Sequence, residues 1–164
     1  MATIKELMLI RPRLTLAVAE SMTCGRVQAQ IGKISGASRF FIGGITTYTL
    51  DQKVRHLGVS RVAASAVNCV SAEVAEQMAR GACAFFSASL GVATTGYAEP
   101  EPEWDVAEPF AWWAVAHRQR TGRFGVRSGR VDCPGAPRVL AQEIAAAAAL
   151  SALEEFLKSL RRRR

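Results

Sequence analysis

Residues 19–25, AESMTCG, put small and polar side chains where an apolar run ends and a helical pattern begins. Ser21 would then stand near a helix N-terminus, whose unpaired N–H groups and dipole favour negative charge. A serine in that place becomes a nucleophile when a base lies beside it. The alternative is that Ser21 or Thr23 only caps the helix, which is the commonest use of Ser and Thr there. The residues alone leave both interpretations open.

A candidate base occurs in TYTLDQK, where Tyr48 follows a β-branched run and Lys53 falls one turn into the next expected helix. A lysine partly buried beside apolar groups loses proton affinity and can act as a base near neutral pH. A solvated helix lysine is the alternative. A later apolar run, LGVATTG, ends on Thr95 and Gly96. Because open α/β sheets bind ligands at the carboxyl ends of their strands, three polar strand ends together predict a pocket.

Hydrophobic periodicity indicates the elements that must position these residues. It predicts strands over 14–19, 41–49, 90–96, 110–117 and 122–131, the last two antiparallel with a turn at Thr121–Gly122. It predicts a short N-terminal helix over 2–11 and further helices ending near 32, over 50–58 with a glycine C-cap, after the cap Ser71, and over about 137–160. Helices alternate with strands at first and two strands then follow one another. This order predicts a mixed sheet covered by helices on both faces.

The segment 97–109, YAEPEPEWDVAEP, breaks this alternation with three prolines and five of the chain's 14 acidic residues. Such proline spacing predicts a loop, and a loop of this length in one domain is commonly functional or mobile. Two interpretations fit its charge: it lies over the pocket, where it would oppose a phosphate, or it turns outward. Trp104 within it either plugs the site or anchors a contact with another protein. Trp112 and Trp113 fit the core or an oligomer surface.

Length and composition exclude several classes of protein. The chain has 164 residues, 49% of them hydrophobic and 21% charged, which is typical of a single ordered domain over 1–164. No apolar run approaches the roughly 20 residues of a membrane span, and no signal peptide is seen, so we expect a cytoplasmic protein without membrane association. Four of the net +7 charges lie in RRRR at 161–164, and no basic–aromatic pattern accompanies them, which argues against nucleic acid as a partner.

Metal and disulfide chemistry is not indicated either. The four cysteines form no CxxC pair, so we expect reduced thiols and no metal site. His56 and His117 are isolated from one another and from other ligand types. We expect no cofactor.

Several motifs, in order and spacing, resemble one family. AESMTCG, GASRFFIGGITTYTLDQKVRHLGV, VSAEVAEQMARGA and LGVATTGYAEP resemble the C-terminal domain of the competence/damage-inducible CinA proteins, which also occurs alone as nicotinamide-nucleotide amidase. The resemblance covers about residues 14–100 well and the last helix loosely. It implies a three-layer α/β/α sandwich with a mixed, mostly parallel central sheet, and a homo-oligomer.

The resemblance also implies an activity, hydrolysis of the carboxamide of nicotinamide mononucleotide or a related small molecule to a carboxylate and ammonia, without metal. Ser21 would attack the amide carbon, Lys53 would take its proton, and Tyr48 would assist or orient the lysine. A helix N-terminus would supply donors for the oxyanion. The substrate-binding residues implied are Glu20, Thr23, Gly25, Gly43, Gly44, Thr95, Gly96 and Arg138.

This chain departs from the family pattern at the expected site. Met22 replaces a cysteine, and Cys24 replaces a glycine at a turn where positive φ is costly for other residues, so we expect the start of the helix to differ. The acidic segment 97–109 replaces a glycine-rich loop, and Gln142 stands where the family has a second arginine. These changes leave a second hypothesis open, a catalytically inactive relative that binds a small ligand or a protein partner.

Overall fold

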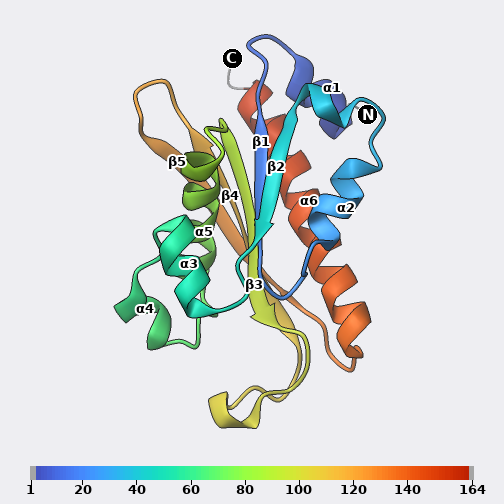
Figure 1. Cartoon of the computed structure of the whole chain (residues 1–164). Helices are drawn as coiled ribbons and strands as arrows, with labels where there is room; N and C mark the ends of the chain where they lie inside the picture. Colours follow the sequence, from blue (N-terminus) through green and yellow to red (C-terminus); the bar gives the residue numbers. More distant parts are fainter. Residues whose placement is uncertain (1–2, 163–164) are drawn as a thin grey trace.

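The computed structural model describes residues 3–162, and its centre is one sheet of five strands (Figure 1). The strands are β1 (Leu16–Glu20), β2 (Phe41–Thr46), β3 (Leu90–Tyr97), β4 (Phe110–Arg118) and β5 (Phe124–Asp132). Their order across the sheet is β2-β1-β3-β4-β5, with β2, β1 and β3 parallel and the β3–β4 and β4–β5 pairs antiparallel. Strand β5 therefore runs in the same direction as the first three. The predicted mixed, mostly parallel sheet is confirmed.

Helices cover both faces of this sheet. The helices are α1 (Ile4–Leu9), α2 (Arg26–Gly32), α3 (Leu50–Leu57), α4 (Arg61–Ser65), α5 (Ala72–Phe85) and α6 (Arg138–Arg162), with short 3-10 turns at Ala37–Arg39 and Pro102–Trp104. In Figure 1, α3 and α5 lie on one face and α1, α2 and α6 on the other. This arrangement confirms the three-layer α/β/α sandwich. Of the helices within residues 3–162, none combines the length and apolar character that crossing a membrane requires.

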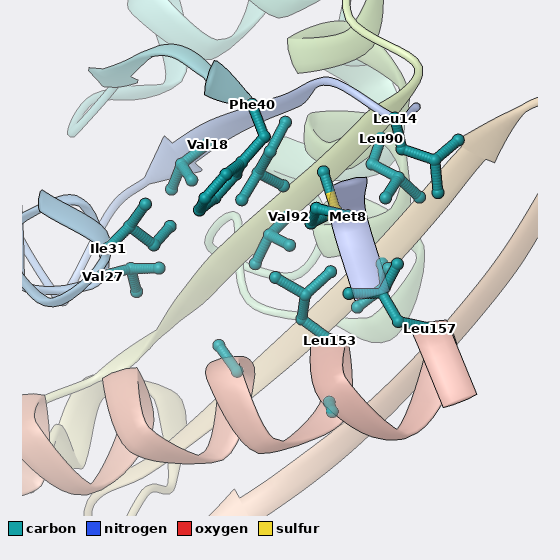
Figure 2. Packing of buried hydrophobic residues seen from close by; sticks show 14 of the residues in the cluster. Met8, Leu14, Val18, Val27, Ile31, Phe40, Leu90, Val92, Leu153 and Leu157 are labelled. Carbon is teal, nitrogen blue, oxygen red and sulfur yellow. The ribbon is translucent and has the colours of Figure 1, made fainter. Parts of the chain in front are cut away.

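Alternate residues of the strands point to opposite faces of the sheet, where they join two separate apolar cores. Strand β1 is buried along its whole length: Val18 packs beneath α2 and α6, whereas Ala17 and Ala19 face α5. Figure 2 shows the first core, in which side chains from β1, β3, α2 and α6 meet around Phe40 and Met8. The core beneath α5 is built largely from alanines, which let this helix lie close to the sheet. Trp112 and Trp113 are partly buried on opposite faces, each packed against one of the cores.

Most predicted elements are present, with shifted ends. The helix over 50–58 ends on Gly58, which has φ +65°, and Ser71 caps α5 through the N–H of Val74, both as predicted. The N-terminal helix predicted over 2–11 covers only Ile4–Leu9, and residue 2 lies outside the described residues. Strand β2 ends at Thr46, three residues before the predicted end, and the last helix runs to Arg162 instead of about 160. Helix α4 was not predicted.

One of the C-terminal arginines makes contacts within the fold. Arg161 donates to the backbone carbonyls of Leu7, Ile10 and Pro12, so it joins the end of α6 to the end of α1. The last two arginines, 163–164, lie outside the described residues.

Candidate active site

The register of the parallel strands brings three polar segments to one edge of the sheet. Glu20, the last residue of β1, pairs with Thr46 of β2 on one side and with Thr94 of β3 on the other. The residues that follow these positions therefore leave the sheet together, which places Ser21 and Thr95 at the same edge. This is the carboxyl edge at which α/β sheets bind ligands, as the sequence predicted.

A cavity of about 580 Å³ opens at this edge. Its walls come from the turn after β1, the start of α3, the segment between α4 and α5, the end of β3 and the start of α6. The predicted site residues that line it are Ser21, Tyr48, Lys53, Thr95, Gly96 and Arg138. The structure thus brings together six of the eleven residues singled out from the sequence.

The side chains of Ser21 and Lys53 are in direct hydrogen-bond contact. Lys53 Nζ lies 2.9 Å from Ser21 Oγ and 2.8 Å from each of two backbone carbonyl oxygens, those of Thr47 and Tyr48. Lys53 is only 1% exposed and Ser21 7%. Because a carbonyl oxygen can only accept, the neutral amine would direct both of its N–H bonds at the carbonyls. Its lone pair then faces the hydroxyl of Ser21.

Burial shifts the titration of Lys53 toward neutral pH. Loss of hydration lowers its pKa from 10.5 to about 8, and the nearby Cys69 acts weakly in the opposite direction. With that pKa about one amine in ten is neutral at pH 7, against about one in 3,000 for an ordinary lysine. The solvated lysine considered from the sequence is therefore excluded.

The carboxylate of Glu20 holds the turn that presents Ser21. Glu20 is fully buried and accepts from the N–H groups of Gly25, the N-cap of α2, and of Val27 and Gln28 in its first turn. It also accepts from Thr23 Oγ1 at 2.6 Å. Thr23 also lies 2.7 Å from Thr94 Oγ1. The N–H groups at this helix N-terminus are therefore bonded within the protein. This corrects the expectation that they would stabilise an oxyanion: neither Glu20, Thr23 nor Gly25 lines the cavity.

The turn takes two successive left-handed residues. Cys24 has φ +49° and Gly25 has φ +94°, and the Cys24 N–H donates to the carbonyl of Ser21 at 3.1 Å. Cys24 therefore adopts positive φ at the position where the family has a glycine. The bonds to Glu20 and Ser21 hold the backbone in this conformation, whose cost for a residue with a Cβ is about 1–2 kcal/mol.

Gly43 and Gly44 lie within β2 and outside the cavity lining. A Cβ on Gly43 would lie 2.9 Å from the ring of Phe86, and one on Gly44 would overlap the side chain of Gln28. Both glycines therefore make room for helix side chains on either face of the sheet. Their family motif reflects packing in this chain, which corrects their expected place beside the substrate.

Sequence reasoning missed the segment between α4 and α5, which closes one wall of the cavity. Asn68 and Cys69 have φ +47° and +62°. Thr95 Oγ1 donates to the carbonyl of Cys69 at 2.7 Å, and Asn68 Nδ2 donates to the hydroxyl of Tyr97 at 3.1 Å. The available signal was the asparagine in the apolar stretch AVNCV, because Asn tolerates the left-handed region better than most residues.

The phenol of Tyr48 takes part in a different network from the one expected. Tyr48 is half-exposed, and its hydroxyl accepts from Arg138 at 3.0 Å, while Arg138 also forms an ion pair with Glu99. The contact of Tyr48 with Lys53 is made by its backbone carbonyl. Tyr48 therefore orients the lysine through its main chain.

The acidic segment lies partly over the cavity. Glu99 and Glu101 line it, whereas Trp104, 44% exposed in the short turn Pro102–Trp104, does not. Trp104 therefore does not plug the cavity.

Gln142 is buried and donates to the carbonyl of Met22 at 2.8 Å, so it holds the turn after Ser21. No group of three His, Cys, Asp or Glu within residues 3–162 is arranged to hold a metal ion.

Comparisons with known proteins agree on one family. The family model of the CinA C-terminal domain matches residues 1–157. A CinA-like protein of Picosynechococcus is 36% identical over 145 residues, which are 88% of this chain and 34% of that protein. A CinA-like protein of Shewanella is 34% identical over 149 residues, 91% of this chain and again 34% of the relative. The chain thus spans about a third of the length of these relatives.

Solved structures share the fold over nearly the whole chain. A CinA-superfamily protein of Klebsiella pneumoniae superposes with a TM-score of 0.83 at 23% identity, covering 95% of this chain and 94% of the other. A competence/damage-inducible protein of Agrobacterium tumefaciens superposes with a TM-score of 0.77 at 27% identity, covering 94% and 90%.

Proposed function

The chain belongs to the CinA C-terminal domain family, and from this premise we propose that it is an amidohydrolase of the nicotinamide-nucleotide amidase type. Its reaction would convert the carboxamide of nicotinamide mononucleotide, or of a related compound, to a carboxylate and ammonia. One observation carries the proposal, the 2.9 Å contact between the buried amine of Lys53 and the hydroxyl of Ser21 at the floor of a cavity.

The proposed reaction is acyl transfer in two halves. Ser21 Oγ attacks the amide carbon while Lys53 Nζ takes the hydroxyl proton. The tetrahedral intermediate collapses by breaking the C–N bond, and the proton on Lys53 passes to the leaving nitrogen, which departs as ammonia. An ester on Ser21 remains. Water attacks this ester, again giving its proton to Lys53, and Ser21 leaves as the alcohol when the proton returns.

The two carbonyls around Lys53 have a defined part in this scheme. Thr47 and Tyr48 hold the amine by 2.8 Å hydrogen bonds in both protonation states, so the proton moves without displacement of the side chain. Burial, which lowers the pKa of Lys53 to about 8, keeps both states accessible near neutral pH.

A second candidate function is a non-catalytic ligand-binding domain. It is favoured by the same three acceptors, because a protonated Lys53 has three hydrogens for three oxygens and is fully satisfied as a structural cation. The two functions differ in whether Ser21 is acylated.

Ammonia release from nicotinamide mononucleotide tests the proposal at pH 8.5, where most Lys53 side chains are neutral. We expect turnover by the wild type and loss of at least about 10³-fold in Ser21→Ala and Lys53→Met. Ser151→Ala and Lys33→Met, at exposed positions of α6 and after α2, are the matched controls. Turnover retained in Ser21→Ala would exclude the mechanism. A folded wild type that binds the compound without releasing ammonia would favour the binding domain.

A further inference from the structure

Two of the four charged side chains that line the cavity are engaged with each other. In the described part of the chain the four are two cations, Lys53 and Arg138, and two carboxylates, Glu99 and Glu101. Lys53 Nζ lies within 2.9 Å of three oxygens of the protein itself. Arg138 forms an ion pair with Glu99 and donates to the hydroxyl of Tyr48. A phosphate that entered this cavity would meet the carboxylate of Glu101, an arginine already paired with Glu99, and a lysine that is neutral when it acts as the proposed base.

The backbone beside Glu101 adds no donors for an anion. Pro100 and Pro102 have no N–H group, and the N–H of Glu101 between them donates to the carbonyl of Val106 at 2.9 Å. Phosphate sites are commonly built from backbone N–H groups in a loop, from a helix N-terminus or from arginine and lysine. The first turn of α2 is occupied by the carboxylate of Glu20. Neither the backbone of residues 100–102 nor the first turn of α2, which lies outside the cavity lining, offers a free N–H group to a phosphate.

The carboxylate of Glu101, for which Arg138 is not a partner, instead suits a positive or neutral ligand. Glu101 lies near the phenol of Tyr97, whose pKa is raised chiefly by burial and further by the charge of Glu101. A carboxamide on a pyridinium ring carries a positive charge on the ring nitrogen, and carboxylates across the cavity would attract it. Its amide would have to reach Ser21, on the same cavity wall as Lys53.

We propose that the site selects carboxamides that carry no phosphate, neutral or cationic, and that Glu99 and Glu101 determine this selectivity. The proposal rests on the amidohydrolase function proposed above and narrows its substrate class. Nicotinamide riboside and nicotinamide mononucleotide are the matched probes, because they differ only in the phosphate. In Glu99→Gln the side chain of Arg138 loses its ionic partner and becomes able to receive a phosphate.

The experiment measures kcat/KM for both compounds in the wild type, Glu99→Gln and Glu101→Gln. Glu103→Gln is the control, because the exposed carboxylate of Glu103 lies in the same segment but outside the cavity lining. We expect the wild type to prefer the riboside by about tenfold, and each cavity variant to reduce that preference by about threefold to tenfold. Glu103→Gln should keep the wild-type preference. At 0.5 M salt the preference should shrink, because screening weakens exposed charges.

A preference for the mononucleotide, or a riboside preference that neither cavity variant reduces, would overturn the selectivity while leaving the amidase function intact. Ammonia from neither compound would overturn the amidase function instead. In that case calorimetric titration of the wild type with each probe decides the selectivity: tighter riboside binding supports it, and equal or weaker riboside binding rejects it.

Discussion

The amine of Lys53 lies 2.9 Å from the hydroxyl of Ser21, although 32 positions separate the two residues in the chain. Parallel pairing of β1 with β2 brings the ends of these strands together, and α3, which begins four residues after β2, returns Lys53 over them. The contact therefore depends on the register of β1 with β2 and on the position of α3. It is the feature from which the following predictions start.

The pH dependence of catalysis should report the titration of Lys53. In the proposed mechanism the neutral amine is the active form, so kcat/KM for ammonia release should rise with pH and reach half of its plateau near pH 8, the lowered pKa of this residue. Initial rates between pH 6 and 10 measure it, with circular dichroism at each pH as the control for folding. A half-point near 10.5, or a rate independent of pH, would contradict the role of Lys53 as base.

The free energy of unfolding should rise with pH because of the titration of Lys53. The pKa of Lys53 is about 8 in the folded protein, lower than its ordinary value of 10.5. Between these two pH values the unfolded chain binds more protons than the folded protein. The folded state therefore gains stability as pH rises from about 8 to 10.5. The whole gain corresponds to about 3 kcal/mol. Urea unfolding of the wild type and Lys53→Met at pH 7.5 and 10 isolates it, since only the wild type contains this group. A difference between the two proteins that is the same at both pH values would contradict the prediction.

Replacement of Glu20 should destabilise the whole turn. Glu20→Ala leaves three buried or partly buried N–H groups and the Thr23 hydroxyl without their acceptor, and we expect a loss of about 3 kcal/mol in the free energy of unfolding. Chemical denaturation measures it. Glu103→Ala removes an exposed carboxylate and should change stability by less than about 0.5 kcal/mol. A similar small effect at Glu20 would show that water replaces its bonds.

A methyl group on Gly96 should disturb both the fold and the cavity. The Cβ of Gly96→Ala would overlap the carbonyl of Phe110 and lie 2.7 Å from Ala111 Cα, both backbone atoms of β4 that cannot rotate away. We expect a loss of about 2–3 kcal/mol and a lower kcat/KM.

Gly32→Ala is the matched comparison for that variant. Gly32 ends α2, and a Cβ there meets no atom within 4 Å. It should raise stability by up to about 1 kcal/mol through helix propensity. Thermal unfolding of the two variants side by side should therefore give shifts of opposite sign, and an unchanged or higher melting temperature for Gly96→Ala would contradict the close approach at Gly96.

Much of the fold could be predicted from the sequence, because local patterns determine it. The apolar stripe and the Ser71 cap specify α5, Gly58 ends α3 in the left-handed region, and the order of helices and strands specifies a mixed sheet between two helical layers. The polar strand ends likewise indicated the edge where Ser21 and Thr95 meet. Each of these features depends on residues close together in the chain and on the period of the hydrophobic pattern.

Tertiary structure alone decided what the side chains do at that edge. Only packing determines that the carboxylate of Glu20 is hydrogen-bonded to the N-terminus of α2. The same holds for the ion pair of Arg138 with Glu99, which lies 39 residues away in the chain. The burial that lowers the pKa of Lys53 depends on surrounding elements that no local motif specifies. Sequence placed the candidate nucleophile and base at strand and helix ends, whereas the distance and dielectric between them came from long-range contacts.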